Sequence, residues 1–389
     1  MASVIPPNAT KLVKFTDQVA GHDRLLRFST HDLMVIKPAT RKEIDFYEEA
    51  QQRPDFECWI PKCFGNLHMA TDSELAMLRE QHINDAELSE TLLKASSTTD
   101  ADTPLQDHRP SDSQGRSLDD ILCSIIEWNN LCLENVLHGF TRPCVLDLKL
   151  GTRLYDDDAT PEKREKMQKN AKGTTSEELG IRISGMKVYN TIDRTWAIYD
   201  KQFGRSRTAD TILDGLLSFF FPTSAYAKAN DPVIVQDEEQ EKDIGGSSSN
   251  NDSNRKRISG TKMNWILENL LDDIGSIREY VEEHPELEMY CASLLMVFEG
   301  DKEAADTTWK SMLQKDRQEK TRALEEGENE EEEEDEEEEP KLCDVRLIDF
   351  AHSRWDANRQ SQDEGLLKGL DNIMTLLEKC MEKQSNENL

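Results

Sequence analysis

An aspartate and a lysine, two residues apart in the stretch VLDLKLG (145–151), are of a type and spacing suited to phosphate chemistry. The alternation predicts a β-strand whose leucines face the core, while Asp147 and Lys149 share the other face, about 7 Å apart. Pro143 suits the first residue of such a strand, and Gly151 permits a sharp exit. The pattern alone also fits an edge strand that shows a charged pair to water.

A basic segment follows this strand closely. Thr160 is a suitable N-cap and Pro161 a suitable first helical residue, so we expect a helix over about 160–172. Residues 161–172 hold five bases against two acids and have almost no apolar face. Its lysines are Lys163, Lys166, Lys169 and Lys172. Such a helix could receive a small polyanion, and the alternative is a solvated helix that balances acids elsewhere.

Two further residues are of the types that phosphoryl-transfer enzymes use. Asp349 ends the apolar strand pattern of RLIDFAH (346–352), where such an enzyme places a magnesium ligand. Lys37 ends the apolar pattern LMVIKP (33–38), where a kinase-like lobe keeps the lysine that grips nucleotide phosphates. Asp-Phe is a common dipeptide, and strand lysines often extend to the surface, so neither residue alone indicates a kinase. Phosphoryl transfer is indicated by the chain order of Lys37, the Asp147–Lys149 strand, the basic helix and Asp349.

The signature P-x-x-x-D-x-K-x-G, which Pro143, Asp147, Lys149 and Gly151 fit, is that of the inositol polyphosphate kinases, and the chain resembles this family. Further blocks that resemble the family occur in its order: DQVAGH (17–22), LENV (133–136), LGIRISGMKVY (179–189), FGRSRT (203–208), ASLLMVFEG (292–300) and LIDFAH (347–352). The resemblance extends over nearly all of the chain outside three polar insertions. It is closest to the multikinase branch, particularly the fungal type.

The resemblance implies an α+β, two-lobed fold like that of protein kinases and ATP-grasp enzymes, with ATP between the lobes. The N-lobe, with an antiparallel sheet, would comprise 1–136 and carry a polar insertion at about 65–118. The larger mixed C-lobe would comprise 137–389, with disordered insertions at about 230–260 and 313–341.

The resemblance also implies which residues bind nucleotide and metal. Lys37 would contact the ATP phosphates, steadied by Glu43. Asp349 would bind magnesium, with Ser293 nearby. The backbone of three residues would form the hinge that holds adenine: Glu134, Asn135 and Val136.

Transfer and substrate binding would fall to the signature strand and the basic helix. Asp147 would contact the nucleotide ribose or a substrate hydroxyl. Lys149 would neutralise charge on the transferred phosphoryl group, and His352 would contact the inositol phosphate together with the lysines of the basic helix. The alignment register of these lysines against relatives is ambiguous by about two residues. Which of the lysines contact phosphate therefore stays open.

The implied activity is an ATP-dependent kinase of soluble inositol polyphosphates, from inositol 1,4,5-trisphosphate to tetrakis- and pentakisphosphate. Mg²⁺ would be the metal cofactor, with Mn²⁺ as an alternative. The front lobe lacks G-x-G-x-x-G and the chain lacks an H-R-D loop, which argues against a protein kinase. Two other functions stay open: a nuclear scaffold that acts through the acidic run, and a phosphatidylinositol bisphosphate kinase.

Charge and hydropathy limit the partners. Thirteen acids in 325–339 account for part of the formal net charge of −31, and the rest of the chain carries −18, which argues against direct nucleic-acid binding. No apolar stretch approaches the ~20 residues of a membrane span, and the first residues lack the apolar core of a signal peptide. We therefore expect no membrane anchor and a location in nucleus and cytoplasm, where cysteines stay reduced. We also expect a monomer whose protein partners would bind the acidic run.

Overall fold

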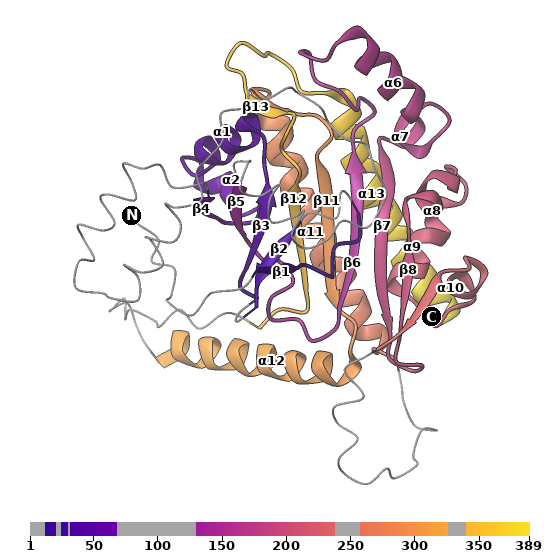
Figure 1. Cartoon of the computed structure of the whole chain (residues 1–389). Coiled ribbons are helices and arrows are strands. Elements are labelled where there is room, and N and C mark those ends of the chain that lie inside the picture. Colours follow the sequence, from indigo (N-terminus) through magenta and orange to yellow (C-terminus); the bar gives the residue numbers. More distant parts are fainter. Residues whose placement is uncertain (1–11, 21–24, 30–31, 68–129, 238–256, 326–339) are drawn as a thin grey trace, which may run out of the picture. The chain divides into compact units, whose positions relative to one another are not determined.

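The computed structural model describes residues 12–20, 25–29, 32–67, 130–237, 257–325 and 340–389 (Figure 1). The chain divides into two compact units. The first unit comprises Met1–Thr16, Arg24–Arg41 and Cys63–Glu134, and the second comprises Asp17–Asp23, Lys42–Lys62 and Asn135–Leu389. Most of the insertion predicted at about 65–118 and most of the acidic run lie outside the described residues.

The first unit contains a five-stranded antiparallel sheet in the order β1-β2-β3-β5-β4. Leu26, Phe28 and Ile36 are buried together and form the apolar side of this sheet. β-branched and aromatic residues that alternate in short runs favour such pairing. The strands are β1 (Leu12–Lys14), β2 (Leu26–Phe28), β3 (Met34–Pro38), β4 (Cys63–Leu67) and β5 (Asn130–Glu134).

The second unit is built on a six-stranded antiparallel sheet in the order β12-β11-β6-β7-β8-β9. A separate two-stranded sheet pairs β10 with β13. The strands are β6 (Pro143–Leu150), β7 (Ile181–Asn190), β8 (Thr195–Tyr199), β9 (Val233–Gln236), β10 (Leu287–Met289), β11 (Ser293–Glu299), β12 (Cys343–Ile348) and β13 (Ser353–Trp355).

Helices cover one face of this sheet. Phe298 on β11 packs against Phe219 and Phe220, with ring centroids 5.0 and 5.8 Å away. Figure 1 shows α13, in yellow, passing behind β6 and β7 and lying beside α11. The helices are α1 (Arg41–Ala50), α2 (Pro54–Glu57), α6 (Pro161–Ala171), α7 (Thr175–Leu179), α8 (Lys201–Ser206), α9 (Ile212–Phe220), α10 (Ala225–Ala229), α11 (Gly260–Glu283), α12 (Lys302–Glu325) and α13 (Glu364–Glu387).

Two predicted insertions are shorter than expected. The insertion predicted at about 313–341 starts too early, because α12 continues to Glu325. This stretch is polar but rich in Lys, Gln, Glu, Arg and Ala, which favour helix, so polarity alone was misleading. The insertion predicted at about 230–260 contains β9, whose Val-Ile-Val run favours a strand. None of the described helices combines the length and the hydropathy that crossing a bilayer requires.

Candidate active site

Strand β6 lies inside the six-stranded sheet, between β11 and β7. Leu146, Leu148 and Leu150 are buried, as the alternation predicted. On the opposite face Asp147 is only 7% exposed, and the Lys149 side chain is 21% exposed. The alternative interpretation of this motif as an edge strand showing its charges to water is therefore wrong.

A row of side chains crosses this face at the level of Lys149. In the sheet register Lys149 pairs with Arg182 on β7 and with Ser293 on β11, and Ser293 pairs with Ile348 on β12. Directly paired residues of antiparallel strands point to the same face, so the three polar side chains lie side by side. Asp349 follows Ile348 at once, and its Oδ2 lies 3.6 Å from Lys149 Nζ.

The backbone beside Lys149 is strained at two positions. Cys291 and Asp349 have φ angles of 59° and 68°, in the left-handed region that non-glycine residues rarely adopt. The Cys291 carbonyl accepts a hydrogen bond from Lys149 Nζ at 2.8 Å. The buried carboxylate of Glu43 accepts the backbone N–H of Phe350 at 3.2 Å and so holds the turn after β12. Strain of this kind gathers at ligand sites.

Asp147 has an unusual environment for a carboxylate. Burial raises the pKa of Asp147 to about 6, the Lys149 ammonium opposes this shift, and the Asp349 carboxylate adds to it. The nearby Ser293 hydroxyl favours the ionised form. Even so, Asp147 Oδ1 and Ser293 Oγ are buried and make no hydrogen bond of normal geometry to any described residue. Buried oxygens without a hydrogen-bond partner indicate a site where a bound ligand supplies the missing hydrogen bonds.

The basic helix α6 begins as predicted. Thr160 caps it, accepting the backbone N–H of Lys163 at 3.3 Å, and Pro161 is the first helical residue. Lys163 Nζ lies 3.3 Å from Nε2 of His352, so the helix meets the end of the LIDFAH segment. The side chains of the other three lysines are exposed and make no hydrogen bond or ion pair with described residues: Lys166, Lys169 and Lys172.

Asp156 holds the other side of the His352 ring. Its Oδ2 lies 2.7 Å from His352 Nδ1 and 3.4 Å from Lys42 Nζ. Although burial raises the pKa of Asp156, the His352 and Lys42 contacts outweigh burial and hold it below its usual value. The sequence analysis missed this residue because it is one of three consecutive aspartates, Asp156–Asp158, and only the fold distinguishes them.

The predicted nucleotide residues lie in both units. Lys37 pairs with Leu131 across β3 and β5, and Glu134 is the last residue of β5. The boundary between the units falls between Glu134 and Asn135, within the predicted hinge, and Val136 is buried in the second unit. Lys37 and Glu43 belong to different units, so their contact stays a prediction.

The sequence analysis assigned no role to the approach of segment 17–20 to β7. Gly185 is the register partner of Asp147, and a Cβ added to it would lie 2.0 Å from the Val19 carbonyl oxygen. Asp17 accepts a hydrogen bond from Lys187 Nζ at 2.6 Å. Only glycine at position 185 therefore lets residues 17–20 lie against the sheet beside Asp147.

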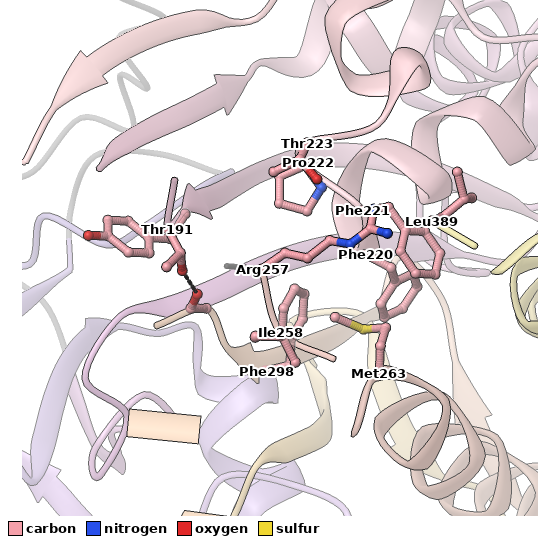
Figure 2. Close-up of a pocket in the computed structure, with 12 residues that line it drawn as sticks. Thr191, Phe220, Phe221, Pro222, Thr223, Arg257, Ile258, Met263, Phe298 and Leu389 are labelled. Carbon is pink, nitrogen blue, oxygen red and sulfur yellow. Dashed lines mark hydrogen bonds between the residues drawn. The ribbon is translucent and has the colours of Figure 1, made fainter. Parts of the chain in front are cut away.

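A pocket elsewhere in the second unit contains none of the predicted site residues (Figure 2). Phe298, Phe220 and Met263 give it an apolar lining, and the long side chain of Arg257 extends across it. Its guanidinium donates to the Asn388 carbonyl near the end of the chain. One cation that already has a partner does not suit a polyphosphate. The cluster of Lys149, Asp147, Ser293 and Asp349 is therefore the better candidate site.

Comparison with known proteins finds a matching family and individual relatives. The model of the family "Inositol polyphosphate kinase" matches residues 130–240 and 249–378. An inositol polyphosphate multikinase of Saccharomyces cerevisiae is 28% identical over 93% of this chain and 96% of its own length. The corresponding enzyme of Schizosaccharomyces pombe is 28% identical over 56% of this chain and 67% of its own.

A solved structure shares the fold. The inositol phosphate multikinase of S. cerevisiae, in complex with ADP and Mn²⁺, superposes with a TM-score of 0.51 at 21% identity, over 89% of this chain and 98% of that one. The predicted fold class is thus confirmed. The chain belongs to the inositol polyphosphate kinase family and is a kinase of inositol phosphates.

Proposed function

We propose that this kinase transfers the γ-phosphoryl group of ATP to soluble inositol polyphosphates, from inositol 1,4,5-trisphosphate to the tetrakis- and pentakisphosphates. The observation that carries the proposal is the cluster on one side of the second unit. Lys149 contacts Asp349, and Lys163 contacts His352, which belongs to the same LIDFAH segment. A cation beside a metal-binding carboxylate, next to a second cationic group, suits two phosphorylated ligands that meet there.

Each residue then has a chemical role. Lys149 neutralises charge on the phosphoryl group in flight, because its Nζ is held by the Cys291 carbonyl and needs no rearrangement. The buried Asp147 carboxylate, whose Oδ1 has no hydrogen-bond partner among the described residues, accepts a hydrogen bond from a hydroxyl of the ribose or the inositol. Lys163 and His352 bind phosphate groups of the substrate, because Lys163 supplies charge and donors and the His352 ring lies beside its ammonium group. Lys37 contacts the nucleotide phosphates.

The carboxylate of Asp349 fits a divalent metal. Its side chain is 40% exposed, so an ion can reach it. The described residues contain no group of three or more His, Cys, Asp and Glu able to hold a metal by themselves. A single carboxylate suits Mg²⁺ that takes its other ligands from nucleotide phosphates and water. The solved relative contains Mn²⁺, which supports Mn²⁺ as the alternative. The Ser293 hydroxyl, buried beside Lys149, would support this site.

The nearly complete match to the S. cerevisiae multikinase favours a multikinase over a hexakisphosphate kinase. The mouse inositol hexakisphosphate kinase 3 is 27% identical, but over 65% of this chain and 51% of its own length. The match to the S. cerevisiae multikinase has nearly the same identity and extends over both chains almost completely. Similarity along the whole length of this multikinase supports inositol tris- and tetrakisphosphates as the substrates, in preference to the hexakisphosphate.

Chromatography of reaction products tests the proposal. Purified protein is incubated with ATP, Mg²⁺ and inositol 1,4,5-trisphosphate, and product isomers are resolved over time, with inositol hexakisphosphate as a parallel acceptor. Successive tetrakis- and pentakisphosphate peaks are expected. Phosphorylation of the hexakisphosphate alone would contradict the proposal.

Location and assembly are proposals from the sequence. We propose that the kinase acts in nucleus and cytoplasm as a monomer, with protein partners at the acidic run 325–339. Imaging of a tagged chain and light scattering test the location and the monomer. A protein-interaction comparison of the full chain with a Δ325–339 variant tests the partner surface.

A further inference from the structure

Two segments hold the cationic groups of the candidate active site. The turn between β10 and β11 holds Lys149, because the Cys291 carbonyl accepts a hydrogen bond from its Nζ at 2.8 Å. The connection 151–160 between β6 and α6 holds His352, because Asp156 Oδ2 lies 2.7 Å from its Nδ1. Phosphoryl transfer depends steeply on the placement of its two reactants, so the separation of these two segments matters for the rate.

Arg153 joins the two segments. It belongs to the connection 151–160, where its Nη2 donates to Asp157, and its Nη1 donates to the Tyr290 hydroxyl of the turn at 3.1 Å. Its guanidinium carbon lies 4.3 Å from the ring centroid of Tyr290 and 4.9 Å from that of Tyr155. A guanidinium group is planar and rigid and stacks on aromatic faces, so a single group holds both rings.

Tyr290 links Arg153 to Lys149. Tyr290 is 5% exposed, and its backbone N–H donates to the His352 carbonyl at 3.3 Å. The next residue is Cys291, which has a strained φ of 59° and whose carbonyl holds the Lys149 ammonium group. A strained conformation persists only where its neighbours hold it, and the contact of Arg153 with the Tyr290 ring is one such restraint.

Tyr155 links Arg153 to the helix α6. Its hydroxyl accepts a hydrogen bond from Nε2 of Gln168, on α6, at 2.9 Å. The residue after it is Asp156, which orients the His352 ring. The guanidinium group of Arg153 therefore contacts one ring that is tied to the turn before β11 and another that is tied to α6.

We propose that Arg153 is a positioning residue of phosphoryl transfer. By holding Tyr155 and Tyr290, it sets the separation between the two sides of the site. On one side the Lys149 ammonium group neutralises the transferred phosphoryl group, and on the other side α6 binds the acceptor. This assignment of the two sides rests on the proposed function. Arg153 acts through the two rings, and its role requires no contact with either ligand.

Arg207 offers a matched control. Its guanidinium donates to Asn230 Oδ1 at 3.0 Å and lies 4.6 Å from the ring centroid of Phe203. These contacts are of the same kinds as those of Arg153, but they join the end of α8 to the end of α10 and involve none of the predicted site residues. A general loss of packing should therefore appear in variants of either arginine, and a loss of positioning in variants of Arg153 alone.

Kinetics of the full chain separate positioning from stability. The variants are Arg153→Met, Arg153→Lys, Tyr155→Leu and Arg207→Met. Each is assayed for kcat and KM with inositol 1,4,5-trisphosphate, for ATP hydrolysis without an acceptor, and for its thermal unfolding temperature. The quantity compared is the ratio of kcat/KM for transfer to the rate of hydrolysis. A water molecule, unlike an inositol hydroxyl, needs no fixed place relative to α6.

Arg153→Met should lower this ratio by about tenfold or more, because small displacements of the reacting groups are costly. Tyr155→Leu should lower it as well, and Arg153→Lys should restore part of it, because lysine keeps the charge and lacks the planar group. Arg207→Met should lower the unfolding temperature at an unchanged ratio.

An unchanged ratio in Arg153→Met, or an equal fall in Arg207→Met, would overturn the positioning role. If Arg153→Met does not fold, an unchanged ratio in Tyr155→Leu overturns it instead. If the parent phosphorylates inositol hexakisphosphate alone, the proposed function fails, and the same ratios measured with that acceptor still test Arg153.

Discussion

Replacing Asp147 by asparagine should stabilise the ligand-free protein, and only above acidic pH. Burial raises the pKa of this carboxyl from 3.8 to about 6. A difference of roughly two units, at 1.36 kcal/mol per unit, corresponds to about 3 kcal/mol between the folded and unfolded chains. Asparagine has nearly the same shape and carries no charge, so it removes this cost.

The direction with pH follows from proton binding. Because the pKa is raised in the folded protein, the folded chain binds the proton more tightly than the unfolded chain does. At pH 4 and below the carboxyl is protonated in the folded protein and its cost is small. As the pH rises from about 4 to 6, the wild-type protein loses up to about 3 kcal/mol, and above pH 6 the loss is constant. Asp147→Asn should escape this loss.

Urea unfolding at several pH values measures the effect. Both proteins are unfolded between pH 4.5 and 7.5 without nucleotide and with a chelator, and the difference in unfolding free energy is plotted against pH. The difference should grow in favour of Asp147→Asn by about 2–3 kcal/mol across this range. Asp210→Asn, at an exposed loop aspartate, is the control. A flat plot for Asp147→Asn would refute the reasoning.

Three other predictions concern activity. Lys149→Ala and Asp349→Ala should each abolish phosphoryl transfer with an unchanged circular dichroism spectrum; near-normal turnover in either would overturn the site assignment. Asp156→Asn should raise the KM for the inositol phosphate severalfold at an unchanged KM for ATP, because Asp156 orients the His352 ring; equal changes in both constants would point to a general structural role. Deleting 325–339 should weaken discrimination against other polyanions in competition assays, and unchanged discrimination would exclude a role for the acidic run in selectivity.

Local patterns in the sequence predicted the strand and the helix that carry the candidate site residues. The alternation around Asp147 and Lys149 and the capping of α6 by Thr160 both occur as predicted. These features depend on a few consecutive residues, whose periodicity is readable directly. The start of the insertion at about 313 was misplaced, because polar composition does not distinguish a solvated helix such as α12 from an irregular loop.

What the sequence could not supply were contacts made across long separations. Lys163 and His352 are 189 residues apart, and Asp156 and His352 are 196 apart. The place of Arg182 opposite Lys149 is likewise invisible until the register of β6 and β7 is known. The sequence analysis assigned no role to Arg182, and only strand pairing brings it beside Lys149.

The most direct test is a crystal structure of the protein with ADP, a divalent cation and inositol 1,4,5-trisphosphate bound together. We expect the trisphosphate to lie between Lys149 and α6, with phosphate oxygens within hydrogen-bond distance of Lys163 and His352 and the cation on Asp349. A trisphosphate bound elsewhere, with residue 149 and α6 both out of its reach, would contradict the central claim.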